Sequence, residues 1–203
     1  MRVIAGTAKG RKLLSVPGDT TRPVTDRVKE SLFNILGGDI RDAVLLDLFA
    51  GTGGVGIEAL SRGARCVVFV DRVRKAVETV RRNLDITGLA DRARIVQGDA
   101  FHYLDHAQDA PFDYIYVAPP QYQDIWAQVL LALDERDLLA PDGEVIIQIH
   151  PKEARDLPLR TLEMYRERRY GSTLLRFYVL REPEEGAGDV EDDTQEPNDA
   201  GAD

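Results

Sequence analysis

Residues 44–60 read VLLDLFAGTGGVGIEAL, in which an apolar run, a cluster of glycines and a second apolar segment follow one another directly. The run 44–48 is typical of a strand buried on both faces, and the second segment has no helix breaker before Gly63. Glycines take backbone conformations closed to residues with a Cβ, and they let a ligand approach closely. The pattern predicts a strand, a tight turn and a helix whose unpaired N–H groups face a ligand.

Two classes of cofactor use a turn of this kind. The spacing Gly51-x-Gly53-x-x-Gly56 matches the dinucleotide fingerprint, and Asp71 lies 20 residues after Gly51, where an acid would hold ribose hydroxyls. Taken alone, these residues would indicate NAD as the cofactor.

Three further features favour S-adenosylmethionine. Asp47 stands at the end of the strand, where its carboxylate would repel a pyrophosphate but attract a cationic cofactor. The segment RIVQGDA (94–100) ends a third predicted strand with an acid–small pair suited to the edge of an adenine, and YIYVAPPQY (114–122) ends a fourth predicted strand with a diproline and an aromatic residue. Because no segment resembles a nicotinamide-side catalytic pair, we favour the methyl donor over NAD.

The same motifs, with two others, also carry a family resemblance. The segments RPVTDRVKESLFNIL (22–36), DLFAGTG (47–53), the diproline and the opening RVIAGTAKGR (2–11) resemble bacterial 16S ribosomal RNA guanine-N2 methyltransferases. The resemblance covers residues 1–181. The glycine motif is common to class I methyltransferases, whereas RPVTDRVKE is far more specific. The resemblance implies a Rossmann-like fold with a seven-stranded, mostly parallel sheet whose last strand is antiparallel.

The order of predicted elements leads independently to an α/β fold. Strands alternate with helices from residue 44 onward, and this alternation requires parallel pairing with right-handed crossovers, hence a doubly wound sheet. Ligands of such sheets bind at the carboxyl ends of the strands. Beyond the central unit we expect strands at 65–70, 93–97, 144–149, 160–168 and 172–180, helices at 25–36, 73–87, 101–107 and 121–139, and a small hairpin of residues 2–5 and 12–16 before the sheet.

Charged residues are distributed unevenly along the chain, with a basic N-terminal region and an acidic C-terminal segment. The net charge is −9, but residues 182–203 hold ten acidic and no basic residues, so the rest carries 26 basic against 25 acidic residues. Residues 1–30 hold seven basic and three acidic residues, a local excess that fits a nucleic-acid partner. We expect one methyltransferase domain at 1–181, with a basic extension (1–41) and a Rossmann-like core (42–181), followed by a disordered acidic tail at 182–203.

Cysteine content and hydropathy indicate a cytoplasmic protein. The chain has a single cysteine, Cys66, which excludes an internal disulfide and fits a reducing compartment. No signal peptide follows the first residues, and no apolar run approaches the roughly 18 residues of a membrane helix. We expect a monomer that does not bind membranes.

The cofactor side of the predicted site is built from strand ends. Asp47 and the glycine backbone would hold the methionine portion, Asp71 would take both ribose hydroxyls, and Asp99 would accept from the adenine amine. Each acid has a simpler interpretation as a turn or helix cap, but their common position at strand ends favours binding. The predicted cofactor-binding residues are Asp47, Ala50, Gly51, Gly53, Asp71, Arg72, Asp99 and Ala100.

The acceptor side departs from the family pattern. The resemblance implies Asn, Asp or Ser at position 118, where this chain has Ala118, which has no side-chain acceptor for the amine being methylated. The backbone carbonyls that Pro119 and Pro120 hold in an extended geometry remain, and Tyr122 would stack on the flipped base. We therefore expect a slowed enzyme rather than an inactive one.

RNA contact is predicted at the start of the first helix, where Arg22, Arg27 and Lys29 would grip phosphates, although each alone could belong to a solvated helix face. His102 and His106 have the spacing of metal ligands on a helix, but no third ligand completes a set, so no metal is expected.

The alternatives to an rRNA guanine-N2 methyltransferase are a catalytically weakened RNA-binding protein and an NAD(P)-dependent oxidoreductase.

Overall fold

The computed structural model of the protein describes residues 1–18, 24–108 and 111–182. Arg22 and all but the first residue of the acidic segment 182–203 lie outside these ranges. The helices are α1 (Asp26–Leu36), α2 (Gly54–Arg62), α3 (Arg74–Thr87), α4 (Ala100–His106) and α5 (Ile125–Asp134), with short 3-10 turns η1 (Ala90–Arg92) and η2 (Pro151–Glu153). The strands are β1 (Val44–Leu48), β2 (Cys66–Asp71), β3 (Ala93–Gln97), β4 (Phe112–Val117), β5 (Leu139–Ile149), β6 (Leu162–Tyr170) and β7 (Thr173–Leu180).

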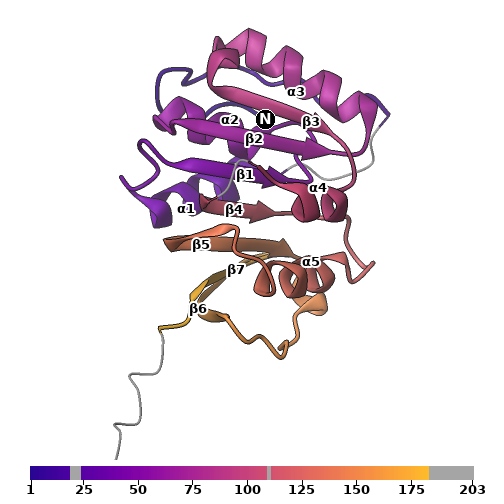
Figure 1. Cartoon of the computed structure of the whole chain (residues 1–203). Coiled ribbons are helices and arrows are strands. Elements are labelled where there is room, and N and C mark those ends of the chain that lie inside the picture. The colour runs from indigo at the N-terminus through magenta and orange to yellow at the C-terminus, as the bar shows by residue number, and fades with distance from the viewer. Residues whose placement is uncertain (19–23, 109–110, 183–203) are drawn as a thin grey trace, which may run out of the picture.

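The strands form one seven-stranded sheet in the order β3-β2-β1-β4-β5-β7-β6 (Figure 1). The first five strands pair in parallel, and β7 runs antiparallel to both β5 and β6. The predicted doubly wound sheet, with its last strand antiparallel, is confirmed. Because the chain proceeds from β1 outward to β2 and β3 on one side and then from β4 outward on the other, the switch point of the topology falls between β1 and β4.

Helices cover both faces of the sheet (Figure 1). One face packs against α1, α2 and α3 through a core that includes Leu32, Ile57 and Val80. The other packs against α4 and α5 through a core that includes Leu104 and Trp126, and Trp126 is only 1% exposed, as expected of a core residue. Strands β1, β2 and β4 between the two layers are mostly apolar because both of their faces are buried.

The turn between β1 and α2 depends on its glycines in two different ways. Gly53 caps α2 in the left-handed conformation with a φ of 74°. Gly56 instead permits close packing of helix on strand, since a Cβ built there would lie 2.3 Å from Cε1 of Phe69 on β2. The glycine pattern therefore fixes both the direction of the turn and the seating of α2 on the sheet.

The N-terminal residues form a small hairpin, as predicted. Arg2 and Lys12 make an isolated antiparallel bridge, and the Val3 amide donates to the Arg11 carbonyl at 3.0 Å. The hairpin is attached to α2, because Glu58 Oε2 accepts from the Ile4 amide at 2.7 Å and Oε1 from the Ala5 amide at 2.9 Å.

Two predicted boundaries are wrong. The helix expected at 121–139 is confined to α5, because left-handed backbone at Asp124, its N-cap, delays its start and Leu139 already pairs with Phe112 in the sheet. The strand expected at 144–149 consequently begins at Leu139, with an irregular register opposite β4.

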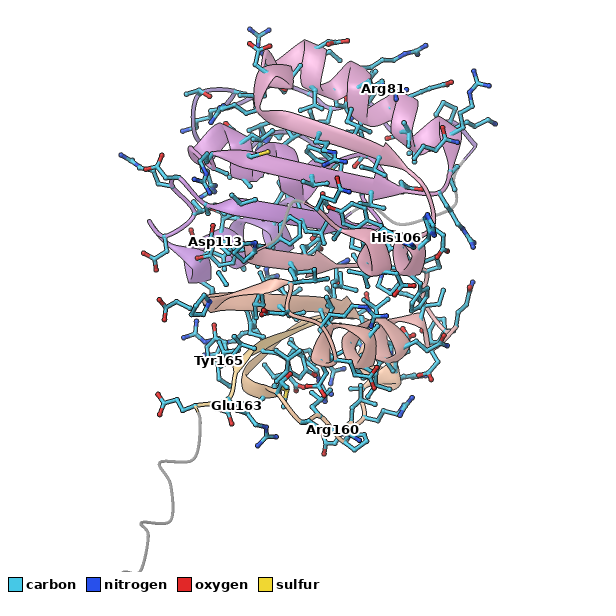
Figure 2. All side chains as sticks on the ribbon, in the orientation of Figure 1. Arg81, His106, Asp113, Arg160, Glu163 and Tyr165 are labelled. Carbon is cyan, nitrogen blue, oxygen red and sulfur yellow. The ribbon has the colours of Figure 1, made fainter. Side chains whose placement is uncertain are left out.

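At the far edge of the sheet, Figure 2 shows Glu163 and Tyr165 on β6. Among the described residues, no helix has the length and apolar character needed to cross a membrane.

Candidate active site

A cavity of about 620 Å³ opens at the carboxyl ends of the parallel strands, within the size range of small-ligand sites. Ten of the residues predicted from the sequence line it: Asp47, Ala50, Gly51, Asp71, Arg72, Asp99, Ala100, Ala118, Pro119 and Pro120. They come from the ends of β1, β2 and β4 and from the turn after β3. Four others, Gly53, Tyr122, Arg27 and Lys29, are not among its lining residues.

The glycine turn presents a different set of amides from the one predicted. The Gly51 amide donates to Asp71 Oδ2 at 2.8 Å, and the Gly53 amide donates to the Ala50 carbonyl at 2.7 Å. Both are therefore used in building the turn rather than in holding a ligand. Gly54 and Val55, the first two residues of α2, line the cavity, and first-turn amides of a helix have no intrahelical acceptor.

Phe49 also belongs to this turn and was missed from the sequence. It lines the cavity, and its φ of 70° is in the left-handed region that non-glycine residues rarely take. The amides of Phe49 and Ala50 both donate to the Val70 carbonyl at 3.0 Å, which holds the strained residue against β2. Strained backbone of this kind clusters at functional sites.

Asp47 is the buried acid of the cavity. It is 2% exposed, and its Oδ2 accepts from the Gly56 amide in the first turn of α2 at 3.1 Å. Burial raises the pKa of Asp47 to about 7, the hydrogen bond from Gly56 opposes this, and the nearby charge of Asp71 adds to it. Asp47 thus satisfies one first-turn amide of α2 and also offers the cavity a carboxyl group whose ionisation a bound cation would favour.

Asp71 ends β2 and lies in the cavity wall, half-buried. Its two oxygens accept from two backbone amides, Oδ2 from Gly51 and Oδ1 from Val73, each at 2.8 Å. Each carboxylate oxygen has a second lone pair, so the side chain is held rigidly and can still accept from two hydroxyl groups. The interpretation as a cap and the interpretation as a ribose ligand are compatible.

Asp99 is the N-cap of α4, where its Oδ1 accepts from the amides of Phe101 and His102 at 2.9 and 3.2 Å. Both Asp99 and the buried Ala100 line the cavity on the side of β3. Farther along α4, His106 Nδ1 lies 2.9 Å from the His102 carbonyl oxygen. No cluster of three or more potential metal ligands occurs in the part of the chain that the structure describes.

The acceptor segment leaves β4 directly into the cavity. Ala118, Pro119 and Pro120 all line it, so the diproline segment and the cofactor-side acids share one space. Tyr122, predicted to stack on the flipped base, is 66% exposed, with a φ of 61°, and its ring centroid lies 5.5 Å from that of His150. Its amide donates to Glu153 Oε1 at 2.7 Å, which holds it outside the lining residues of the cavity.

Of the predicted RNA-contacting residues, only Arg27 has an exposed side chain in the structure. Lys29 is fully buried: its Nζ lies 3.3 Å from Glu58 Oε2 and donates to the Arg2 carbonyl at 2.5 Å. The prediction for Lys29 is wrong, because a side chain enclosed by an ion pair and a carbonyl cannot reach a phosphate. Arg22 lies outside the described residues.

Two polar residues of the cavity wall were also missed. Tyr116 lies beside Asp47 in the register of β1 and β4, and its hydroxyl donates to Gln148 Oε1 at 2.7 Å. Burial, together with the charge of Asp47, raises the pKa of the Tyr116 hydroxyl well above its ordinary value. The sequence holds one signal for Gln148, which is the polar residue in the otherwise apolar run 145–149.

The strand order, the single antiparallel strand and a cavity over the carboxyl ends of β1, β2 and β4 define a class I methyltransferase fold. The chain belongs to the family described as "Conserved hypothetical protein 95", whose model matches residues 1–179. The family resemblance found in the sequence is thereby confirmed.

Individual relatives agree with this assignment. The chain is 42% identical over 185 residues to Bacillus subtilis YlbH, named as a candidate rRNA methyltransferase, covering 89% of this chain and all of that one. It is 32% identical to the ribosomal RNA small subunit methyltransferase D of Haemophilus influenzae, covering 88% and 93% of the two chains. The solved structure of a candidate methyltransferase of Escherichia coli, yhhF, superimposes with a TM-score of 0.76 at 34% identity, covering 89% and 97%.

Proposed function

We propose that this chain is an S-adenosylmethionine-dependent methyltransferase that modifies the exocyclic N2 amine of a guanine in small-subunit ribosomal RNA. The observation that carries the proposal is the shared cavity, where the acids at the carboxyl ends of β1 and β2 and in the turn after β3 meet the diproline segment after β4. The relatives named as rRNA methyltransferases supply the RNA part of the proposal, and the family resemblance supplies the guanine.

The residues present fit the cofactor. Asp71 would take the two ribose hydroxyls with the lone pairs left over from its backbone contacts, and Asp99 and Ala100 would meet the adenine. The first-turn amides of Gly54 and Val55, with Asp47 behind them, would hold the methionine portion. Buried Asp47 favours a ligand with a positive charge and disfavours the pyrophosphate of NAD, because a nearby cation stabilises the ionised carboxylate and a nearby anion destabilises it.

When bound, S-adenosylmethionine supplies an electrophilic methyl group: a nitrogen–carbon bond forms as the sulfur–carbon bond breaks, and the sulfur keeps the electron pair. The chain's own task is to exclude water and to hold the amine nitrogen about 3 Å from the methyl carbon. The backbone carbonyls at Ala118 and Pro119 would accept from the amine and direct its lone pair, and the amine then releases a proton to solvent. Ala118 adds no acceptor of its own, so the reaction is slowed.

The proposed partner is 16S ribosomal RNA, free or in an assembling small subunit, in the cytoplasm, with the enzyme as a monomer. Exposed Arg27 on α1 and Arg22 remain the proposed phosphate contacts, whereas Lys29 is removed from this set. We propose a single domain over residues 1–181, because the hairpin is hydrogen-bonded to α2 of the core.

One observation favours a second candidate. Ala118 lacks the polar group that the family pattern has at this position, as expected of an RNA-binding protein that keeps the cofactor fold but has lost its activity. Such a protein would bind small-subunit RNA tightly and transfer no methyl group.

Two binding titrations and one transfer assay separate the candidates. In calorimetric titrations we expect S-adenosylhomocysteine to bind and NAD to give no binding heat. In the transfer assay we expect labelled methyl groups to appear as N2-methylguanine in RNA digests. Binding of NAD alone would instead indicate an oxidoreductase. Binding of S-adenosylhomocysteine and RNA without transfer of label would favour the weakened RNA-binding protein.

A further inference from the structure

The wall of the cavity contains a hydrogen-bonded polar pair that the reaction, as described so far, does not use. The Tyr116 hydroxyl donates to Gln148 Oε1 at 2.7 Å, and both residues line the cavity. Tyr116 is buried within the apolar core between the sheet and α1–α3, while Gln148 is only partly buried. The pair therefore runs from the core to the open space of the cavity.

Strand register places this pair beside Ala118. Tyr116 pairs with Ile146, so these two side chains lie on the same face of the sheet. Two residues further along each strand, Ala118 and Gln148 face the same way, one step beyond the last paired residues Val117 and Ile147. Gln148 consequently stands beside Ala118 on the neighbouring strand, at the position where the family pattern has a polar side chain.

We propose that Gln148 is an acceptor-binding residue, whose Oε1 accepts an N–H of the target amine in place of a side chain at position 118. This inference rests on the proposed methyltransferase function and concerns how its acceptor is held. Tyr116 is a positioning residue: its hydroxyl fixes the orientation of the carboxamide and makes no contact with the amine.

The chemistry of the two groups fits these roles. A carboxamide oxygen has two lone pairs, and Tyr116 uses one of them, which leaves the second for the amine. Because burial raises the pKa of Tyr116 well above its ordinary value, the hydroxyl stays protonated and remains a donor throughout the working pH range. The Gln148 amide N–H groups would also match the ring nitrogen N3 beside the C2 amine of guanine. A carboxamide is not a base, so the released proton goes to solvent.

The first test compares Gln148→Leu with the full-length unchanged chain in single-turnover methyl transfer. We expect Gln148→Leu to lower the transfer rate about tenfold to hundredfold, because one hydrogen bond to the reacting amine is lost. The affinity for S-adenosylhomocysteine should stay within about twofold, since Gln148 belongs to the acceptor side of the cavity. The matched control is Gln128→Leu on the exposed side of α5, which makes the same chemical change outside the cavity and should leave the rate unaltered.

Two further variants separate a direct role from a structural one. Tyr116→Phe removes only the hydroxyl and should reduce the transfer rate less than Gln148→Leu does, with cofactor affinity retained. In an Ala118→Asn background, Gln148→Leu should reduce the rate much less, because the new side chain supplies the acceptor. A rate for Gln148→Leu equal to that of the unchanged chain, or an equal loss in both backgrounds, would overturn the inference while the proposed function stands. If the unchanged chain itself transfers no methyl group, the proposed function fails and this inference fails with it.

Discussion

Asp47 lies in the environment furthest from water among the acids of the cavity. Its carboxyl group is enclosed between β4 and the start of α2, with one oxygen accepting from the Gly56 amide. Burial raises its pKa from 3.8 to about 7. Because the folded chain holds this proton more tightly than the unfolded chain, the contribution of Asp47 to stability is fully present below pH 3.8 and is lost as the pH rises toward about 7.

The same residue predicts how cofactor affinity depends on pH. A cationic ligand beside Asp47 favours the ionised form, so binding should release protons and tighten as the pH rises from 6 to 8. Asp47→Asn should remove this part of the dependence while leaving the titration of the ligand's own amino group. Calorimetric titration of S-adenosylmethionine into both proteins at several pH values measures the difference. Identical pH profiles for the two proteins would show that Asp47 does not face the charge of the cofactor.

Ala118 gives a second prediction at the scale of a single residue. Ala118→Asn adds a side-chain acceptor beside the diproline for the second N–H of the target amine, Gln148 being proposed to accept the first, and should raise the methyl-transfer rate about tenfold, which corresponds to one more hydrogen bond to the reacting amine. The affinity for S-adenosylhomocysteine should be unchanged, because the variant alters the acceptor side. A transfer rate that stays equal or falls would mean that the added side chain does not reach the amine or does not fit beside the diproline.

At the scale of elements, a buried ion pair joins the hairpin, α1 and α2. Glu58 on α2 accepts from the Ile4 and Ala5 amides and also pairs with Lys29 and Arg62. Lys29 and Glu58 are both fully buried, and burial lowers the pKa of Lys29 while the charge of Glu58 opposes that effect. The arrangement fixes the N-terminal hairpin against the helix whose first turn faces the cavity.

Lys29 and Arg27 should therefore respond in opposite ways to substitution. Lys29→Met leaves the Glu58 carboxylate with Arg62 as its one remaining ion-pair partner among the described residues, and should lower the free energy of unfolding by about 3 kcal/mol. Arg27→Ala should change that free energy by less than about 0.5 kcal/mol but reduce the salt dependence of RNA binding by about one released ion. Urea unfolding and RNA titration over a range of salt concentrations measure the two effects. Unchanged unfolding of Lys29→Met would contradict the structural role.

Particular residues show what the sequence predicted of the site and what it missed. Asp47, Asp71, Asp99 and Ala118 were placed at strand ends, and parallel pairing necessarily brings those ends to one edge, so they were found together. Gln148 could not be placed, because its neighbour depends on the register of β5 against β4 rather than on any local pattern.

The positions of Lys29 and Tyr122 in the structure have related causes. Lys29 was taken as exposed because its burial depends on Glu58, which comes from another helix. Tyr122 was predicted to stack on the flipped base, and the left-handed backbone at Tyr122 and Asp124 and the contact with Glu153 hold it outside the lining of the cavity, so that its stacking role stays a prediction. In both cases contacts between distant segments outweighed the local pattern.

At the scale of the whole molecule, the distribution of charge along the chain affects its affinity for RNA. The chain has a net charge of −9, yet residues 182–203 contribute ten acidic groups and no basic ones. Removal of this segment should increase RNA affinity at low salt, because long-range repulsion of phosphates is reduced, and the gain should vanish at about 1 M salt, where charges are screened within about 3 Å. Cofactor affinity serves as the control and should not change. Weaker RNA binding after truncation would instead assign the acidic segment a direct role in recognition.

We propose above all that the carboxyl ends of the parallel strands hold a methyl donor against a guanine extruded from ribosomal RNA. The most direct test is transfer of labelled methyl groups from S-adenosylmethionine to naked small-subunit RNA and to partly assembled small subunits, followed by mapping of the modified base. We predict label on the N2 amine of a single guanine in at least one of the two substrates. Label on another atom or base, or no transfer to either substrate by protein shown to bind the cofactor, would contradict it.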